Sequence, residues 1–92
     1  MSKSLQIRIR GEVQGVGFRH WTAQQARLLG IRGYVRNLPE GSVEVLAIGD
    51  PQVLNQFCEV LRHGPMLAQV DTLDAKEVPE PSYFDTFRIL YG

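Results

Sequence analysis

Cysteine is nearly absent from this sequence, because Cys58 is the single one among its 92 residues. One thiol excludes an internal disulfide and a multi-cysteine metal cluster, and it suits a reducing compartment. The sequence also lacks an apolar run long enough for a secretion signal or a membrane span. We therefore expect a cytoplasmic protein without a membrane anchor.

Net charge is the second thing the sequence lacks, since ten Lys and Arg residues balance ten Asp and Glu residues. A formal charge of zero argues against a general nucleic-acid surface, although it allows a local positive site. Apolar residues make up 43% of the chain, enough for one core. We expect a single domain over residues 1–92 that acts as a monomer.

Hydrophobic periodicity predicts the order of the elements. Leu5, Ile7 and Ile9 alternate with polar residues, which indicates a half-buried strand, and Phe18, Thr22, Ala26 and Leu29 fall at helical spacing. By the same reasoning we expect further strands at 33–37, 42–49, within 68–78 and at 87–91, a helix at 51–63, and a loop at 79–82. This order predicts an α+β fold of the ferredoxin-like βαββαβ type, an antiparallel sheet with two helices on one face, plus a terminal strand.

The loop between the first strand and the first helix breaks local rules. Gly15 and Gly17 permit backbone angles at which successive N–H groups converge on an anion, and the helix start adds further unpaired donors. Arg19 stands in or just before the first helical turn, where a cation is disfavoured. A bound anion would reverse that penalty. The alternative is a tight crossover with Arg19 in solvent.

Two segments carry a resemblance to a known family. Residues 11–19, Gly-Glu-Val-Gln-Gly-Val-Gly-Phe-Arg, resemble the first signature of the acylphosphatases. Residues 33–37, Gly-Tyr-Val-Arg-Asn, followed by residues 41–43 and Gly49, resemble the second. The resemblance covers essentially the whole chain, and it implies the ferredoxin-like fold and the hydrolysis of acyl phosphates.

The resemblance also implies roles for particular residues. Arg19 matches the arginine that holds the substrate phosphate, and Asn37 matches the asparagine that orients the attacking water. The main-chain phosphate cradle matches Gln14, Gly15, Val16, Gly17 and Phe18. We expect hydrolysis without a metal or other cofactor, because Arg19 supplies the cation. Phosphate and sulfate would compete with the substrate, whose acyl group (acetyl, carbamoyl or glyceroyl) stays open.

Other reactive side chains favour structural interpretations. His20 follows the key arginine but should face a quarter-turn away, and His63 suits a helix C-terminus. Cys58 lies at helical spacing from apolar residues, which favours packing over nucleophilic chemistry. Asp71, Asp74 and Glu77 indicate a solvated strand face rather than a metal site. Arg8, Arg10 and Arg36 would line one sheet face, and a plain exposed face is the favoured interpretation of these three arginines.

A non-catalytic domain on the same fold is the alternative function. An RNA-binding sheet presents aromatic side chains to bases. Here the corresponding positions carry Gln6, Arg8 and Arg10, which are poor stacking groups. A regulatory or carrier domain that binds anions without turnover would share the loop but would not need Asn37.

Overall fold

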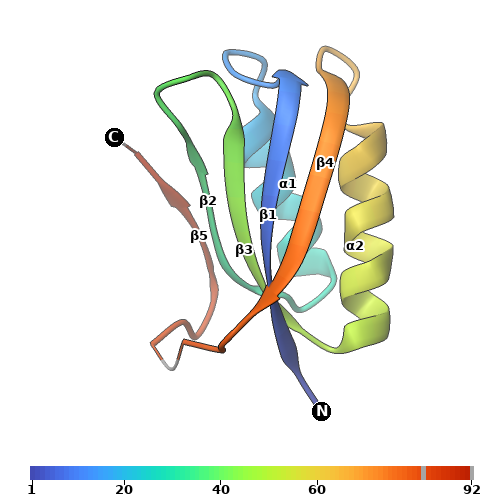
Figure 1. Ribbon diagram of the computed structural model, residues 1–92, viewed down its shortest axis with the longest axis vertical. Helices are drawn as coiled ribbons and strands as arrows, with labels where there is room; N and C mark the ends of the chain where they lie inside the picture. The colour runs from blue at the N-terminus through green and yellow to red at the C-terminus, as the bar shows by residue number, and fades with distance from the viewer. Residues whose placement is uncertain (82, 92) are drawn as a thin grey trace.

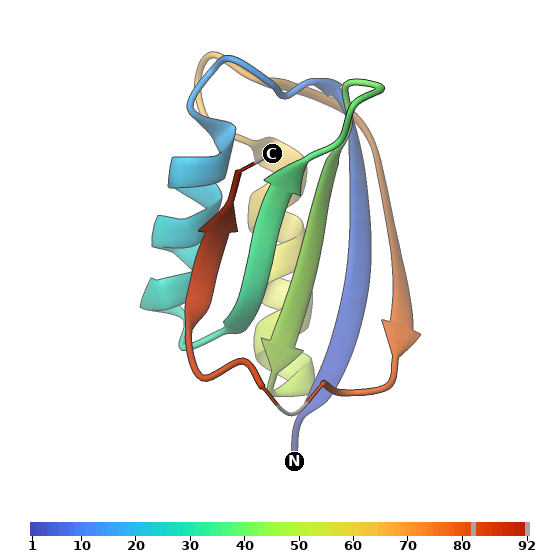
Figure 2. The same ribbon diagram turned by 90° about the vertical axis from the view of Figure 1, so that its left-hand side faces the viewer.

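The computed structural model describes residues 1–81 and 83–91. Five strands form one sheet in the order β4-β1-β3-β2-β5, and both helices cover the same face of it (Figures 1 and 2). The elements are β1 Lys3–Glu12, α1 Phe18–Leu28, β2 Arg32–Asn37, β3 Val43–Gly49, α2 Pro51–His63, β4 Gln69–Val78 and β5 Phe87–Leu90. The predicted ferredoxin-like α+β arrangement is confirmed. Ser82, in the loop expected at 79–82, lies outside the described residues.

The sheet is mixed rather than wholly antiparallel. β1 pairs antiparallel with β3 and β4, and β3 pairs antiparallel with β2, as predicted. β5, however, pairs parallel with β2, so that Gly33 lies opposite Phe87. The connection after β4 crosses to the other edge at the same end of the sheet (Figure 2). The strand that follows must therefore run in the direction of β2.

The core lies between the sheet and the two helices. Ile7 and Ile9 of β1 are fully buried, which confirms the predicted alternation. Cys58 lies within this core with its side chain packed, and burial raises the pKa of its thiol. Leu46 and Ile48 of β3 are buried too, although they lie on the sheet face away from the helices. The sequence pattern alone places these two residues on the exposed face.

Local chemistry fixes the ends of both helices. After α1, Gly30 adopts a left-handed φ of 70°, and its N–H bonds the carbonyl of Arg27. The N–H of Ile31 bonds the carbonyl of Ala26, which completes a Schellman closure at the glycine expected to end the helix. At the start of α2, Asp50 accepts a 2.9 Å hydrogen bond from the N–H of Gln52, as the sequence predicts. None of the described helices is long and apolar enough to cross a bilayer.

The connections β1–α1 and β2–β3 lie at one end of the molecule (Figure 1). This follows from the antiparallel run of β1 against β3 and of β3 against β2, because β1 and β2 then point the same way. The C-terminal end of β2 consequently lies at the same end of the sheet as the glycine-rich loop that leads into α1. The fold thereby brings the two signature segments to one place.

Gly33 provides a test of this packing. Its φ is +133°, and a Cβ there would lie 1.9 Å from the carbonyl oxygen of Leu46 on the neighbouring strand. We predict that Gly33→Ala lowers the free energy of unfolding by about 3 kcal/mol or more, because backbone strain and overpacking add. Gly41→Ala is the control, since Gly41 also has a positive φ but no atom within 4 Å. The expected loss for Gly41→Ala is about 1 kcal/mol. Equal losses for the two variants in urea unfolding would contradict the close packing of Gly33 against β3.

Candidate active site

The β1–α1 loop presents open backbone. Gly15 and Gly17 have φ values of 75° and 76°, a left-handed conformation that favours glycine. A Cβ built on either residue meets no atom within 4 Å, so the loop is not shaped by packing at these positions. The glycines are needed for the backbone path itself. A ligand has free access to the main chain here.

The start of α1 is uncapped. Gly17 is the N-cap residue and offers no side chain, and the first turn contains no acidic residue. The first bond across the helix start runs from the N–H of Trp21 to the carbonyl of Gly17. Among the described residues, no protein acceptor is found for the N–H groups of residues 15–20. This cluster of unpaired donors, together with the helix dipole, gives the loop a positive potential.

Arg19 is the second residue of α1 and adds a full positive charge to that potential. Its Nη1 donates a 3.4 Å hydrogen bond to the carbonyl of Leu90, and its guanidinium lies 4.7 Å from the ring centroid of Tyr91. The ion pairs found within residues 1–81 and 83–91 do not include Arg19. Its charge is thus oriented by neutral groups of the C-terminal segment and is not neutralised by them.

Asn37 ends β2 next to this loop. Its Oδ1 is buried and has no hydrogen-bond partner among the described residues. A buried acceptor without a donor costs about 1–3 kcal/mol, which a water or ligand donor would recover. The amide oxygen is therefore suited to accept a hydrogen bond from a molecule in the site.

One small cavity joins these features. Its volume is about 80 Å³, room for two or three waters at roughly 30 Å³ each. It is lined by Val13, Gly15, Gly17, Phe18, Arg19, His20 and Asn37. The structure thus brings together five of the residues selected from the sequence. Among the described residues, no cluster of three or more His, Cys, Asp or Glu side chains is arranged to hold a metal ion.

Gln14 and Val16 belong to the loop but do not line the cavity. Val16 is partly buried and packs against the core. The side chain of Gln14 donates from Nε2 to the carbonyls of Leu38 and Ser42, at 2.8 and 2.9 Å. Gln14 therefore ties the loop to the β2–β3 turn, directly after Asn37, and fixes the two halves of the site against each other. Sequence reasoning did not identify this side-chain role.

His20 is a lining residue that sequence reasoning set aside. It is exposed, and it borders the same cavity as Arg19 and Asn37. The quarter-turn between Arg19 and His20 does not move His20 away from the cavity. All residues of the first helical turn surround the N-terminal end of the helix, where the cavity lies. That N-terminal position was the signal that could have found it.

Comparison with known proteins agrees with this fold and loop. The family model described as Acylphosphatase matches residues 5–89. The chain is 42% identical over 88 residues to an acylphosphatase of Archaeoglobus fulgidus, covering 96% of this chain and 98% of that one. It is 48% identical over 84 residues to an acylphosphatase of Yersinia pseudotuberculosis, covering 90% of each. It is also similar to the crystal structure of acylphosphatase from Bacillus subtilis, with a TM-score of 0.92, 32% identity and coverage of 99% and 100%.

The fold and loop define a ferredoxin-like α+β protein with an electropositive cavity at the start of its first helix. Together with the family model and the relatives, they establish that the chain belongs to the acylphosphatase family and is an enzyme of the hydrolase class.

Gln14 allows the loop tether to be tested apart from the charge of Arg19. Replacing Gln14 with Glu places a carboxylate against the carbonyls of Leu38 and Ser42, where like partial charges repel. We predict that phosphate inhibition weakens about tenfold in Gln14→Glu, equivalent to about 1.4 kcal/mol. Gln14→Met, which loses the donors without adding charge, should show a smaller change. Unchanged inhibition constants in both variants would mean that the tether does not shape the site.

Proposed function

We propose that this chain hydrolyses the carboxyl–phosphate bond of small-molecule acyl phosphates, releasing a carboxylate and inorganic phosphate. In this proposal Arg19 and the amides of residues 14–18 hold the phosphate, and Asn37 orients the attacking water. The observation that carries the proposal is the single cavity shared by Arg19, the glycine loop and Asn37. A cationic donor and a neutral acceptor meet there at the uncapped end of α1.

Binding follows from the charges at this end of the helix. The guanidinium of Arg19 and the loop N–H groups crowd positive charge where no protein anion balances it among the described residues. A phosphate dianion relieves this crowding, and the planar guanidinium can offer it two parallel donors. The same donors stabilise the equatorial oxygens as charge redistributes in the transition state. Free phosphate or sulfate should compete for the same place.

Water activation needs only a modest contribution, because an acyl phosphate is already an activated anhydride. The Oδ1 of Asn37 accepts a hydrogen bond from water and holds it in line with the bond to be broken. A neutral amide is not a base near pH 7, so Asn37 does not remove the proton. Water attacks phosphorus, the bond from phosphorus to the carboxyl oxygen breaks, and a phosphate oxygen takes the proton. Carboxylate then leaves with the bonding electron pair.

We further propose that residues 1–92 act as one domain and as a monomer in the cytoplasm. Arg19, the glycine loop and Asn37 meet at one cavity, so the proposed reaction requires no residue from a partner subunit. The single thiol of Cys58 is buried and free, which suits a reducing compartment. A nucleic-acid partner is not part of this proposal.

The proposed role of Arg19 is tested by two variants, one without its charge and one without its paired guanidinium donors. Arg19→Ala should lower turnover by at least 10²–10³, the order expected when one donor to a transition-state oxyanion is removed. It should also abolish inhibition by phosphate. Arg19→Lys keeps the charge but not the paired donors, so its turnover should lie between that of the unmodified protein and that of Arg19→Ala. Steady-state kinetics with added phosphate measure both effects, and normal inhibition of Arg19→Ala would refute the binding role.

Asn37 is tested by following benzoyl phosphate loss through its ultraviolet absorbance. The unmodified protein should hydrolyse it equally fast with and without EDTA, because Arg19 supplies the cation. Asn37→Ala should lose turnover by about 10² or more while phosphate affinity, measured by calorimetry, stays within about threefold. Near-normal turnover of Asn37→Ala would refute the water-positioning role. Phosphate binding without turnover in the unmodified protein would favour the non-catalytic anion-binding alternative.

A further inference from the structure

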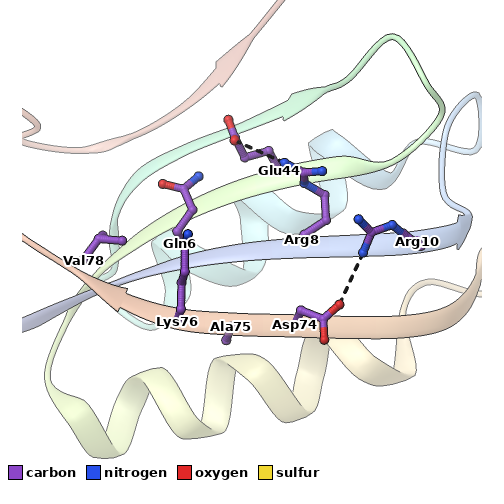
Figure 3. A pocket seen from close by; sticks show the side chains of 8 residues that line it. All are labelled: Gln6, Arg8, Arg10, Glu44, Asp74, Ala75, Lys76 and Val78. Carbon is purple, nitrogen blue, oxygen red and sulfur yellow. Dashed lines mark hydrogen bonds and ion pairs between the residues drawn. The ribbon is translucent and has the colours of Figure 1, made fainter.

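A second hollow lies on the sheet face away from the helices (Figure 3). Its volume is about 560 Å³, within the range of roughly 300–1,000 Å³ typical of small-molecule sites. It spans β3, β1 and β4 and is lined by Gln6, Arg8, Arg10, Glu44, Asp74, Ala75, Lys76 and Val78. None of these residues lines the cavity at Arg19, so the two sites are separate.

Both carboxylates in this hollow already have partners. Glu44 accepts a 2.7 Å bond from the Nε of Arg36 and a 3.0 Å bond from the hydroxyl of Tyr34. Asp74 pairs with Arg10 across the β1–β4 ladder at 3.3 Å. The negative charges of the hollow are therefore matched by Arg36 and Arg10.

Arg8 is left without a comparable partner. Its nearest carboxylates, on Glu40 and Glu44, lie at 3.7 and 4.0 Å, beyond hydrogen-bond distance. Its Nε is buried and donates to nothing among the described residues. A buried donor nitrogen without an acceptor is costly, because the water it loses is not replaced, whereas the rest of this side chain stays partly exposed. Arg8 therefore differs from an ordinary solvated arginine on an exposed face, which is how the sequence alone presents it.

Lys76 and Gln6 complete a set of donors around Arg8. Lys76 lies opposite Gln6 in the β1–β4 ladder, and Gln6 is two residues from Arg8 on the same face of β1. Figure 3 shows the side chain of Lys76 reaching toward Gln6, with Arg8 further along β1 beside Glu44. Within residues 1–81 and 83–91, Lys76 forms no ion pair or hydrogen bond. Arg8, held only by its long ion pairs to Glu40 and Glu44, and Lys76 thus border one space together with the amide of Gln6.

We propose that this hollow is a second anion-binding site, which takes a small oxyanion with two or more phosphoryl or carboxylate groups. Arg8 offers a planar fork two residues from Gln6 along β1, and Lys76 offers a compact charge across the ladder from Gln6. One anionic group at each cation therefore makes a bridging ligand more favourable than a single charge. Gln6 donates to the ligand between them. The site does not depend on the proposed hydrolysis, because it shares no lining residue with the cavity at Arg19.

Isothermal titration calorimetry with inorganic pyrophosphate tests the proposal on the full chain. The unmodified protein should bind close to two equivalents, one at each site, and Arg19→Ala should keep one. When Lys76→Gln or Arg8→Gln is added to Arg19→Ala, the affinity of the remaining site for pyrophosphate should fall at least tenfold. Lys76 is exposed, so Lys76→Gln should fold normally even if Arg8→Gln does not. Turnover of benzoyl phosphate should stay within twofold in Lys76→Gln.

Arg62→Gln is the matched control, because it removes an exposed charge from α2 that pairs with Glu59 outside the hollow. It should leave both equivalents intact. A parallel titration with malonate distinguishes phosphoryl from carboxylate ligands, and tighter binding of either supports the site if it depends on Lys76. The proposal is overturned if Arg19→Ala binds neither pyrophosphate nor malonate, or if Lys76→Gln and Arg62→Gln weaken binding equally.

Discussion

The crowding of positive charge at the start of α1 is the constraint on which the rest of the site depends. Helix N-termini in proteins are usually satisfied by a capping side chain or an acidic first turn. Here Gly17 provides no cap and Arg19 adds a cation instead. Such an arrangement is unfavourable for the isolated protein and becomes favourable with an anion in place. Under the proposed function, stability and phosphate affinity are therefore opposed at this one turn, as is common where a fold departs from local rules for function.

The surrounding fold holds this unfavourable turn in shape. β1 enters it as an interior strand of the sheet, with β3 and β4 paired to its two edges. Gln14 fixes the loop to the carbonyls of Leu38 and Ser42, and Arg19 is oriented by Leu90 and Tyr91. Each of these supports is neutral, so none of them removes the positive charge that an anion needs. Rigid support without neutralisation is what a preorganised oxyanion site requires.

Local sequence patterns predicted most elements and the residues of the loop. The alternation of β1 and the ends of both helices follow from rules that act over a few residues, as Gly30 and Asp50 illustrate. Contacts between distant segments were not predictable in this way. The parallel pairing of β5 with β2 and the hydrogen bond from Arg19 to Leu90 both depend on which edge of the sheet the chain reaches after β4. The partners of Gln14 belong to the same class, since they lie 24 and 28 residues away.

The bond between Arg19 and Leu90 joins positions 71 residues apart. The guanidinium at the start of α1 is thus oriented by a residue of β5, the edge strand of the sheet. A contact over such a distance carries an entropy cost of loop closure, which the surrounding contacts of the sheet must offset. The pairing of β5 with β2 and the orientation of Arg19 are therefore coupled, so a change that loosens the edge strand also disorders the guanidinium of the proposed site.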